Sequence, residues 1–196
     1  MGRAAAGVGR ERILDASLRL FAQRGVDATS LQTIADELGI TKAAVYHHFQ
    51  AKNQIILEVL REGLEGLEAA VATASLVEEP QARAWVIVRA LADLIVAHRP
   101  SYSVMMNDHT VEAVMRSEPN IAAILDGMEA ALLGPEPTPE RRLAVAFFVA
   151  ALNAPTRPSL RGDHAPSDDA LHARVLALGA HLLALGDAHI GAETQP

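Results

Sequence analysis

The sequence predicts an all-α protein. Along most of its 196 residues, apolar side chains recur at intervals of three and four, the spacing that places them on one face of a helix. No segment sustains the apolar–polar alternation of a half-buried strand. The chain also contains 37 Ala and 24 Leu, both strong helix formers. We therefore expect about nine helices, separated by glycine, proline and capping residues.

Four helices are predicted in the first 75 residues, each bounded by start and stop signals. Gly25 and Gly39 suit the left-handed conformation that often ends a helix, and Thr29, Ser30 or Thr41 can cap the start of the next one. These signals give helices over residues 10–24, 31–38, 42–48 and 52–75.

Five more helices are predicted after residue 79, where prolines mark several boundaries. Pro80 and Pro139 stand at helix starts, whereas Pro100 and Pro119 stand at breaks. Residues 154–169 hold three prolines and a glycine, so we expect a loop there. The expected helices cover residues 80–98, 102–115, 121–133, 139–153 and 168–189.

Composition excludes several classes of protein. Without cysteine, the chain cannot form a disulfide scaffold, a Cys-ligated zinc site, an iron–sulfur centre or a thiol nucleophile. Its longest apolar run, residues 143–152, is far shorter than the roughly 18 residues of a membrane-spanning helix. The N-terminal residues lack the apolar core of a signal peptide. We therefore expect a soluble cytoplasmic protein with no membrane partner.

The charge is unevenly distributed along the chain. A net charge of −7 argues against a nucleic-acid partner only if it is spread evenly. Residues 1–54 carry seven basic and five acidic side chains, a net charge of +2, whereas residues 55–196 carry −9. This asymmetry is typical of a module that approaches polyanions, joined to a body that repels them.

The most informative stretch is residues 29–52, TSLQTIADELGITKAAVYHHFQAK. It predicts a helix, a short turn at Gly39–Thr41 and a second helix of about two turns. Ile40 is expected to fill the gap between the two helices, and Ala35 is small where they pack closely. This is helix-turn-helix geometry, in which the N-terminal residues of the second helix enter the DNA major groove.

Several side chains of this stretch are suited to binding DNA. Lys42 can donate to a guanine edge or to a phosphate, while the methyl groups of Ala43 and Ala44 can contact thymine or allow close approach. Tyr46 and His47 can each donate to phosphate. Because this set is rich in phosphate donors and poor in bidentate base contacts, DNA shape is expected to contribute much of the specificity. The predicted DNA-binding residues are Ser30, Thr41, Lys42, Ala43, Ala44, Tyr46, His47 and Lys52.

Residues 10–66 resemble the N-terminal domain of the TetR family of bacterial transcriptional repressors. The resemblance rests on the pattern RILDASLRLFAQRG, then on TSLQTIADELGITKAAVYHHF, and then on AKNQIILEVL. It implies a homodimer whose two recognition helices read successive major grooves of a palindromic DNA operator. It also implies that Tyr46, His47 and Lys52 contact phosphate.

The resemblance further implies a division into two domains. We expect a DNA-binding domain at residues 8–66, with the helix-turn-helix at about 30–49, and a ligand-binding and dimerisation domain at residues 67–196. In the second domain, apolar side chains with a few polar groups can form a small-molecule chamber. The candidates are Trp85, His98, Tyr102, Met105, Met106, His109 and Phe148.

The resemblance also assigns the last two predicted helices, residues 139–153 and 168–189, to the dimer interface, and the pattern of the last helix supports this independently. Its glycines at 179 and 186 are seven residues apart, and small residues at this spacing let two helices approach closely across a symmetry axis. The alternative is that both glycines face the core of their own protomer. The predicted interface residues are Leu178, Gly179, Leu182 and Gly186.

The sequence thus predicts a repressor that binds a palindromic operator as a homodimer and is released by a small-molecule effector. No metal or other cofactor is expected, because the histidines lack metal-ligand spacing. No nucleophile–base pair or phosphate-binding loop indicates an enzyme. The alternative is an all-α small-molecule binding protein or enzyme with a vestigial DNA module. A non-specific nucleoid protein would need a far more basic chain.

Overall fold

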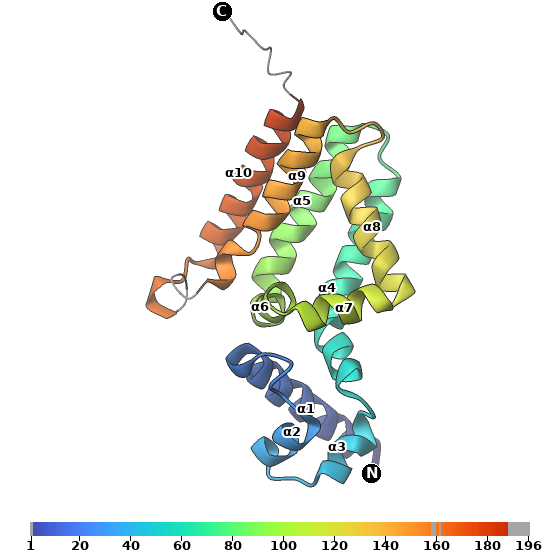
Figure 1. Cartoon of the computed structure of the whole chain (residues 1–196), viewed down its shortest axis with the longest axis vertical. Helices are drawn as coiled ribbons and strands as arrows, with labels where there is room; N and C mark the ends of the chain where they lie inside the picture. Colours follow the sequence, from blue (N-terminus) through green and yellow to red (C-terminus); the bar gives the residue numbers. More distant parts are fainter. Residues whose placement is uncertain (1, 158–159, 161, 188–196) are drawn as a thin grey trace, which may run out of the picture. The chain divides into compact units, whose positions relative to one another are not determined.

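The computed structural model describes residues 2–157, 160 and 162–187, and these residues form ten α-helices and no strand (Figure 1). The predicted all-α class is confirmed. The chain divides into two compact units. The N-terminal unit combines the residues up to Gly66 with Ala97–Ala123, and the C-terminal unit combines Leu67–Val96 with the residues from Ile124 onward.

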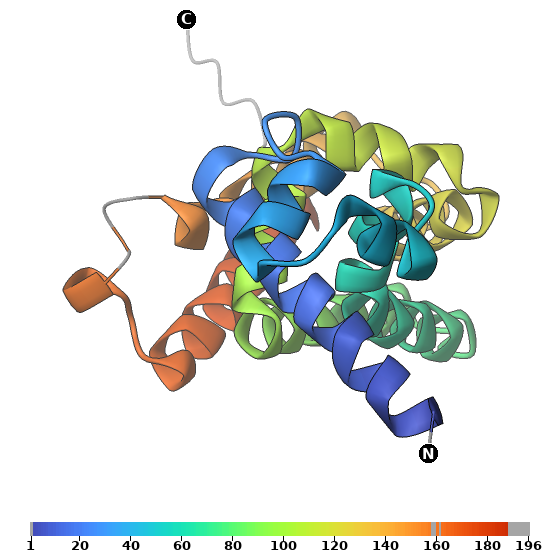
Figure 2. The ribbon, with the colours of Figure 1, turned by 90° about the horizontal axis from the view of Figure 1, so that it is seen from below.

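The N-terminal unit contains three helices that pack on one another, as Figure 2 shows. These are α1 (Gly2–Arg24), α2 (Leu31–Leu38) and α3 (Lys42–His48). The predicted ranges of α2 and α3 are confirmed. The predicted start of α1 at residue 10 is wrong, because the helix already begins at Gly2. The Ala-rich segment before residue 10 has the propensity to extend it.

The core of this unit is apolar and closely packed. Ile13 of α1, Ile34 of α2 and Val45 of α3 are almost completely buried, together with Ile55 and Ile56 at the start of α4 (Lys52–Ser75). Burying each such side chain stabilises the fold by about 1.5–3 kcal/mol. The three short helices are therefore held by a shared core rather than by their own helix propensity.

One predicted helix, residues 102–115, is two helices in the structure. These are α6 (Arg99–Asn107) and α7 (His109–Ser117), with Asp108 between them in an extended conformation. The carboxylate of Asp108 accepts a hydrogen bond from the amide of Thr110, so Asp108 is the N-cap of α7. A residue that caps a new helix also interrupts the old one. Helix α6 packs against α1 within the N-terminal unit.

The C-terminal unit is a helical bundle in which α9 (Pro139–Ala151) and α10 (Asp168–Asp187) lie side by side (Figure 1). It also contains α5 (Pro80–Ala97) and most of α8 (Pro119–Leu133). Among its described residues, the predicted loop holds the short 3-10 helices η1 (Ala154–Thr156) and η3 (Gly162–His164). The last two residues of the predicted 168–189 helix lie outside the described residues.

The core of the C-terminal unit joins α5, α9 and α10. Val88 and Phe148 are completely buried, and a Cβ atom placed on Gly179 would lie 2.6 Å from a methyl carbon of Val88. Glycine at this position therefore allows α10 to approach α5. Within the described part of the chain, no helix is both long and apolar enough to cross a membrane.

Candidate nucleic-acid interface

Local hydrogen bonds fix the turn between α2 and α3. Gly39 adopts a left-handed conformation, with φ of +64°, and its amide donates to the carbonyl groups of Ala35 and Asp36. The next amide, that of Ile40, donates to the carbonyl of Ala35 at 3.0 Å. A side chain at position 39 would be strained in this conformation, so glycine is required for the turn.

Both helices of the motif begin at a hydroxyl cap. The Oγ atom of Ser30 accepts from the amide of Thr33 at 3.1 Å, and the Oγ1 atom of Thr41 accepts from the amide of Ala44 at 3.2 Å. Both cap residues are exposed. These two predicted DNA-binding residues thus organise the helix starts, and their hydroxyl groups remain at the surface.

The other predicted residues of α3 lie on its outer face. Val45 is completely buried, whereas Lys42, Ala43, Tyr46 and His47 are exposed and Ala44 is half-buried. Tyr46 is a large ring with 45% of its surface exposed, and the Nζ atom of Lys42 lies 5.5 Å from the centre of that ring. The cation and the phenol therefore form one surface, which we call the α3 face, comprising Thr41, Lys42, Ala43, Tyr46 and His47.

Lys52, the first residue of α4, has a partner that the sequence did not predict. Its Nζ atom donates a 2.7 Å hydrogen bond to the carbonyl of Val26, in the loop between α1 and α2. An ammonium group has three donors, so this bond fixes the side chain and leaves donors for an anion.

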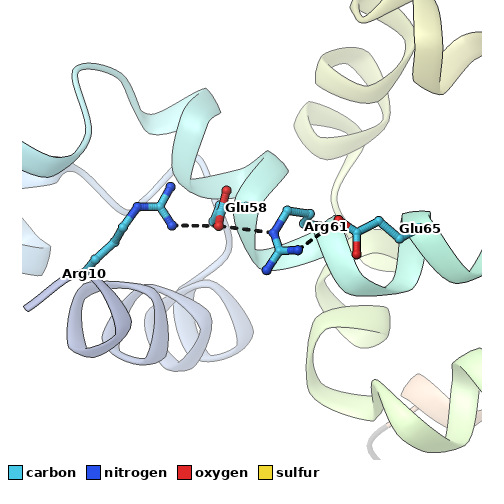
Figure 3. Close-up of polar contacts among 4 residues, drawn as sticks. All are labelled: Arg10, Glu58, Arg61 and Glu65. Carbon is cyan, nitrogen blue, oxygen red and sulfur yellow. Dashed lines mark hydrogen bonds and ion pairs between the residues drawn. The ribbon is translucent and has the colours of Figure 1, made fainter. Parts of the chain in front are cut away.

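A chain of ion pairs connects α1 to α4 (Figure 3). Arg10 donates to Glu58 at 2.6 Å, Glu58 also accepts from Arg61 at 3.2 Å, and Arg61 donates to Glu65 at 2.9 Å. The hydrogen bond from Arg10 is the main reason that the pKa of Glu58 lies below its ordinary value of 4.5. The guanidinium carbon of Arg10 also lies 4.7 Å from the centre of the Phe49 ring. The sequence does not predict this network, because Arg10 and Glu58 are 48 residues apart.

The predicted ligand residues are divided between the two units. In the N-terminal unit, Tyr102 is buried, which raises its pKa well above the usual value, and His98 is half-buried. His109 is 90% exposed beside Asp27, so it faces solvent rather than an enclosed chamber. In the C-terminal unit, Trp85 is half-buried and Phe148 is buried. The side chains of Met105 and Met106 lie outside the described residues.

The predicted dimer residues lie on α10. Gly179 packs against Val88 and Phe148 of its own protomer, the alternative considered for it above, and Leu178 is half-buried. The side chain of Leu182 and the surroundings of Gly186 are outside what the structure describes. Leu143 and Phe147 of α9, which are not among the predicted interface residues, are exposed by 55% and 56%. Their spacing of four residues places them on one face of α9, and that spacing was the available signal.

Comparison with known proteins identifies the helix-turn-helix segment. Residues 13–59 match the family described as bacterial regulatory proteins, tetR family. Residues 13–59 form a tetR-family domain. The match begins in α1 and ends in α4, so this tetR-family domain includes the α3 face and Lys52.

Similar proteins include named regulators. The HTH-type transcriptional repressor KstR2 of Mycolicibacterium smegmatis is 43% identical over 58 residues, which are 30% of this chain and 28% of the repressor's length. The chain thus spans less than a third of that relative. Among solved structures, the TetR family transcriptional regulator PfmR from Thermus thermophilus is 29% identical, with a TM-score of 0.57 over 88% of this chain and 97% of PfmR.

A second solved structure has a similar fold over most of the chain. KstR2 of Mycobacterium tuberculosis, described as a ketosteroid transcriptional regulator, has a TM-score of 0.66 over 89% of this chain and 93% of its own. At 21% identity, the likeness concerns the fold alone.

Proposed function

We propose that the protein is a transcriptional repressor that binds a palindromic DNA operator as a homodimer and is released by a small-molecule effector. The observation that carries the proposal is the α3 face. It presents a lysine, a tyrosine and a histidine side by side on the exposed surface of a helix that Thr41 caps and Gly39 orients. The tetR-family domain and the repressors among its relatives support it.

The chemistry of the α3 face defines what it reads. Lys42 is placed in the first turn of α3, the part of a recognition helix that reaches the base edges. Tyr46, one turn later, offers a hydroxyl group to the phosphate backbone, and Lys52 offers a fixed ammonium group. Ala43 has only a methyl group, which lets the helix approach the floor of the groove closely.

A single recognition helix of seven residues covers few base pairs, so two copies are needed for a specific site. We propose that α9 contributes to the interface between the copies through Leu143 and Phe147. Their exposed apolar surface is typical of an association site, and a two-fold axis would bring each face against its own copy. Gly179 is not included, because it is buried in the core of its own protomer.

Effector release requires that the small molecule binds the DNA-free state more tightly than the DNA-bound state. For the binding site we keep Trp85 and Phe148, the predicted candidates that belong to the C-terminal unit. No residue among these is assigned a catalytic role.

Selection from random DNA tests the proposal. The full-length protein is incubated with a library of duplexes that contain a random segment of about 30 base pairs, three helical turns. We expect recovery of a motif with two inverted half-sites about one turn apart, and a discrete footprint on it. Uniform binding to all duplexes would support a non-specific binder. No binding at low salt would support the alternative, a small-molecule binding protein with a vestigial DNA module. Either result would contradict the proposed repressor function.

A further inference from the structure

The backbone of Val26 is held from two sides. Its amide donates a 2.7 Å hydrogen bond to the Oδ2 atom of Asp108, 82 residues away, and its carbonyl accepts the 2.7 Å bond from Lys52. The same carbonyl accepts from the amide of Thr29 at 3.1 Å. Val26 is itself completely buried. The loop between α1 and α2 thus connects the junction of α6 and α7 to the first residue of α4.

Asp108 is well suited to hold this loop. Its Oδ1 atom accepts from the amide of Thr110 at 3.0 Å, so both carboxylate oxygens are engaged by backbone amides. Burial alone would raise the pKa of Asp108, but the hydrogen bonds from Val26 and Thr110 outweigh it and hold the pKa below 3.8. The carboxylate is therefore ionised at neutral pH, and a charged acceptor makes the stronger hydrogen bond.

A second bond ties the same two segments together. The hydroxyl group of Thr110 donates to the Oδ1 atom of Asp27 at 2.7 Å. Two successive loop residues, Val26 and Asp27, are thus bound to two residues at the start of α7. All of these groups belong to the N-terminal unit. The loop position is thus determined by the α6–α7 junction as well as by Lys52 at the start of α4.

We propose that Asp108 is a positioning residue for DNA binding: it holds Val26, and Val26 holds the ammonium group of Lys52 for a phosphate of the DNA backbone. The proposal rests on the proposed function. The bond from Lys52 to Val26 uses one donor of the ammonium group, and the other donors stay available. Fixing the side chain before binding removes part of the entropy cost of the DNA contact.

The direction in which DNA affinity changes when Asp108 is removed distinguishes a positioning role from an effect of net charge. Asp108 is an anion in a unit that approaches a polyanion, so its removal should strengthen DNA binding by simple Coulomb attraction. If Asp108 positions Lys52, its removal weakens DNA binding instead. Glu112 on α7 provides the matched control, because it is an exposed carboxylate one turn further along the same helix.

The experiment measures the affinity of the full-length protein for the duplex recovered by selection with the unmodified protein. Variants are Asp108→Ala, Asp108→Asn, Lys52→Met, the Asp108→Ala/Lys52→Met double variant and Glu112→Gln. We expect Asp108→Ala to weaken binding roughly tenfold. We expect no further loss when it is added to Lys52→Met, and no loss for Glu112→Gln. The slope of log affinity against log salt should become less steep by about 1 for each phosphate that a variant no longer binds.

Other outcomes overturn the inference. Unchanged or stronger binding by a folded Asp108→Ala, or an equal loss in the Lys52→Met background, means that Asp108 has a structural role only. If Asp108→Ala does not fold, Asp108→Asn decides the question, because it keeps the side-chain volume and removes one acceptor. If the unmodified protein binds no selected duplex, the proposed function itself fails, and the positioning role fails with it.

Discussion

Arg10 on α1 donates a 2.6 Å hydrogen bond to Glu58 on α4 and lies over the ring of Phe49, the residue that follows α3. One side chain thus contacts both α4 and the residue that follows α3. Within the N-terminal unit, Arg10 therefore joins α1 to the segment in which α3 ends and α4 begins.

The first prediction concerns this pair. Arg10→Ala is expected to lower the free energy of unfolding by about 1–1.5 kcal/mol, because it removes an ion pair and a cation–π contact. Glu58→Gln is expected to lower the free energy of unfolding by less, about 0.5–1 kcal/mol. This variant keeps the contact between Arg10 and Phe49, and the ion pair that it removes is partly exposed to solvent. Urea unfolding measures both. Glu62→Gln, an exposed carboxylate on the same helix, is the control. Strictly additive effects in the Arg10/Glu58 double variant would contradict the coupling.

The second prediction concerns pH. The folded-state pKa values of Glu58 and Asp108 both lie below their ordinary values of 4.5 and 3.8. A depressed pKa means that the ionised form stabilises the folded state, so this stability is present above the ordinary pKa and is lost as the pH falls through the folded-state pKa. The difference in unfolding free energy between the unmodified protein and Glu58→Gln/Asp108→Asn should therefore be constant near neutral pH and shrink below about pH 4.5. A difference that grew on acidification would reverse the assigned sign.

The third prediction concerns Arg141, which is buried in the C-terminal unit with 6% of its surface exposed. Its Nε and Nη2 atoms donate to the carbonyl of Leu132 at 3.0 and 2.7 Å, and its Nη1 atom donates to the carbonyl of Leu183 at 3.0 Å. One guanidinium group thus satisfies backbone acceptors of α8 and α10 from its position on α9.

Arg141→Met keeps most of the volume and removes these three hydrogen bonds. We expect a loss of about 2–4 kcal/mol in unfolding free energy. Arg141→Lys should not restore the lost stability, because an ammonium group lacks the planar fork that reaches two carbonyl groups. Arg142→Ala, the exposed neighbour, should change stability by less than about 0.5 kcal/mol. Thermal unfolding followed by circular dichroism compares these three variants with the unmodified protein. If Arg141→Met melted at the same temperature as the unmodified protein, the stabilising role of these hydrogen bonds would be contradicted.

The fourth prediction concerns the apolar face of α9. Phe147→Asp and Leu143→Asp are expected to shift the protein from dimer to monomer in sedimentation velocity, because a charge at a desolvated interface is unpaired. Leu76, which is 84% exposed after the end of α4, provides the control, and Leu76→Asp should leave the sedimentation coefficient unchanged. A dimer that survives both α9 substitutions would exclude this face from the interface.

The sequence predicted those features that depend on neighbours along the chain. The caps at Ser30 and Thr41 and the left-handed Gly39 are confirmed. In each case, the backbone of the next or the preceding three or four residues requires that residue type. A local sequence pattern is therefore sufficient to predict it. The same local signals located the helix-turn-helix and the start of α4.

Features that depend on distant neighbours were not predicted. The break at Asp108 lies within a sequence that has continuous helical character, and its partner Val26 is 82 residues away. Arg10 and Arg141 resemble ordinary surface residues of amphipathic helices in the sequence. Their partners are determined by packing between helices, which periodicity does not encode. The start of α1 was predicted wrongly for a different reason. Before residue 10, the alanines favour a helix whereas the glycines disfavour one.

The most direct test of DNA binding by the α3 face is fluorescence anisotropy with the selected duplex and three proteins: unmodified, Lys42→Ala and Arg89→Ala. Arg89 is exposed on α5, so its removal changes the net charge equally without touching the α3 face. We expect Lys42→Ala to remain folded and to bind at least about tenfold more weakly, while Arg89→Ala binds within about twofold of the unmodified protein. Equal affinities for Lys42→Ala and Arg89→Ala would contradict recognition by this helix.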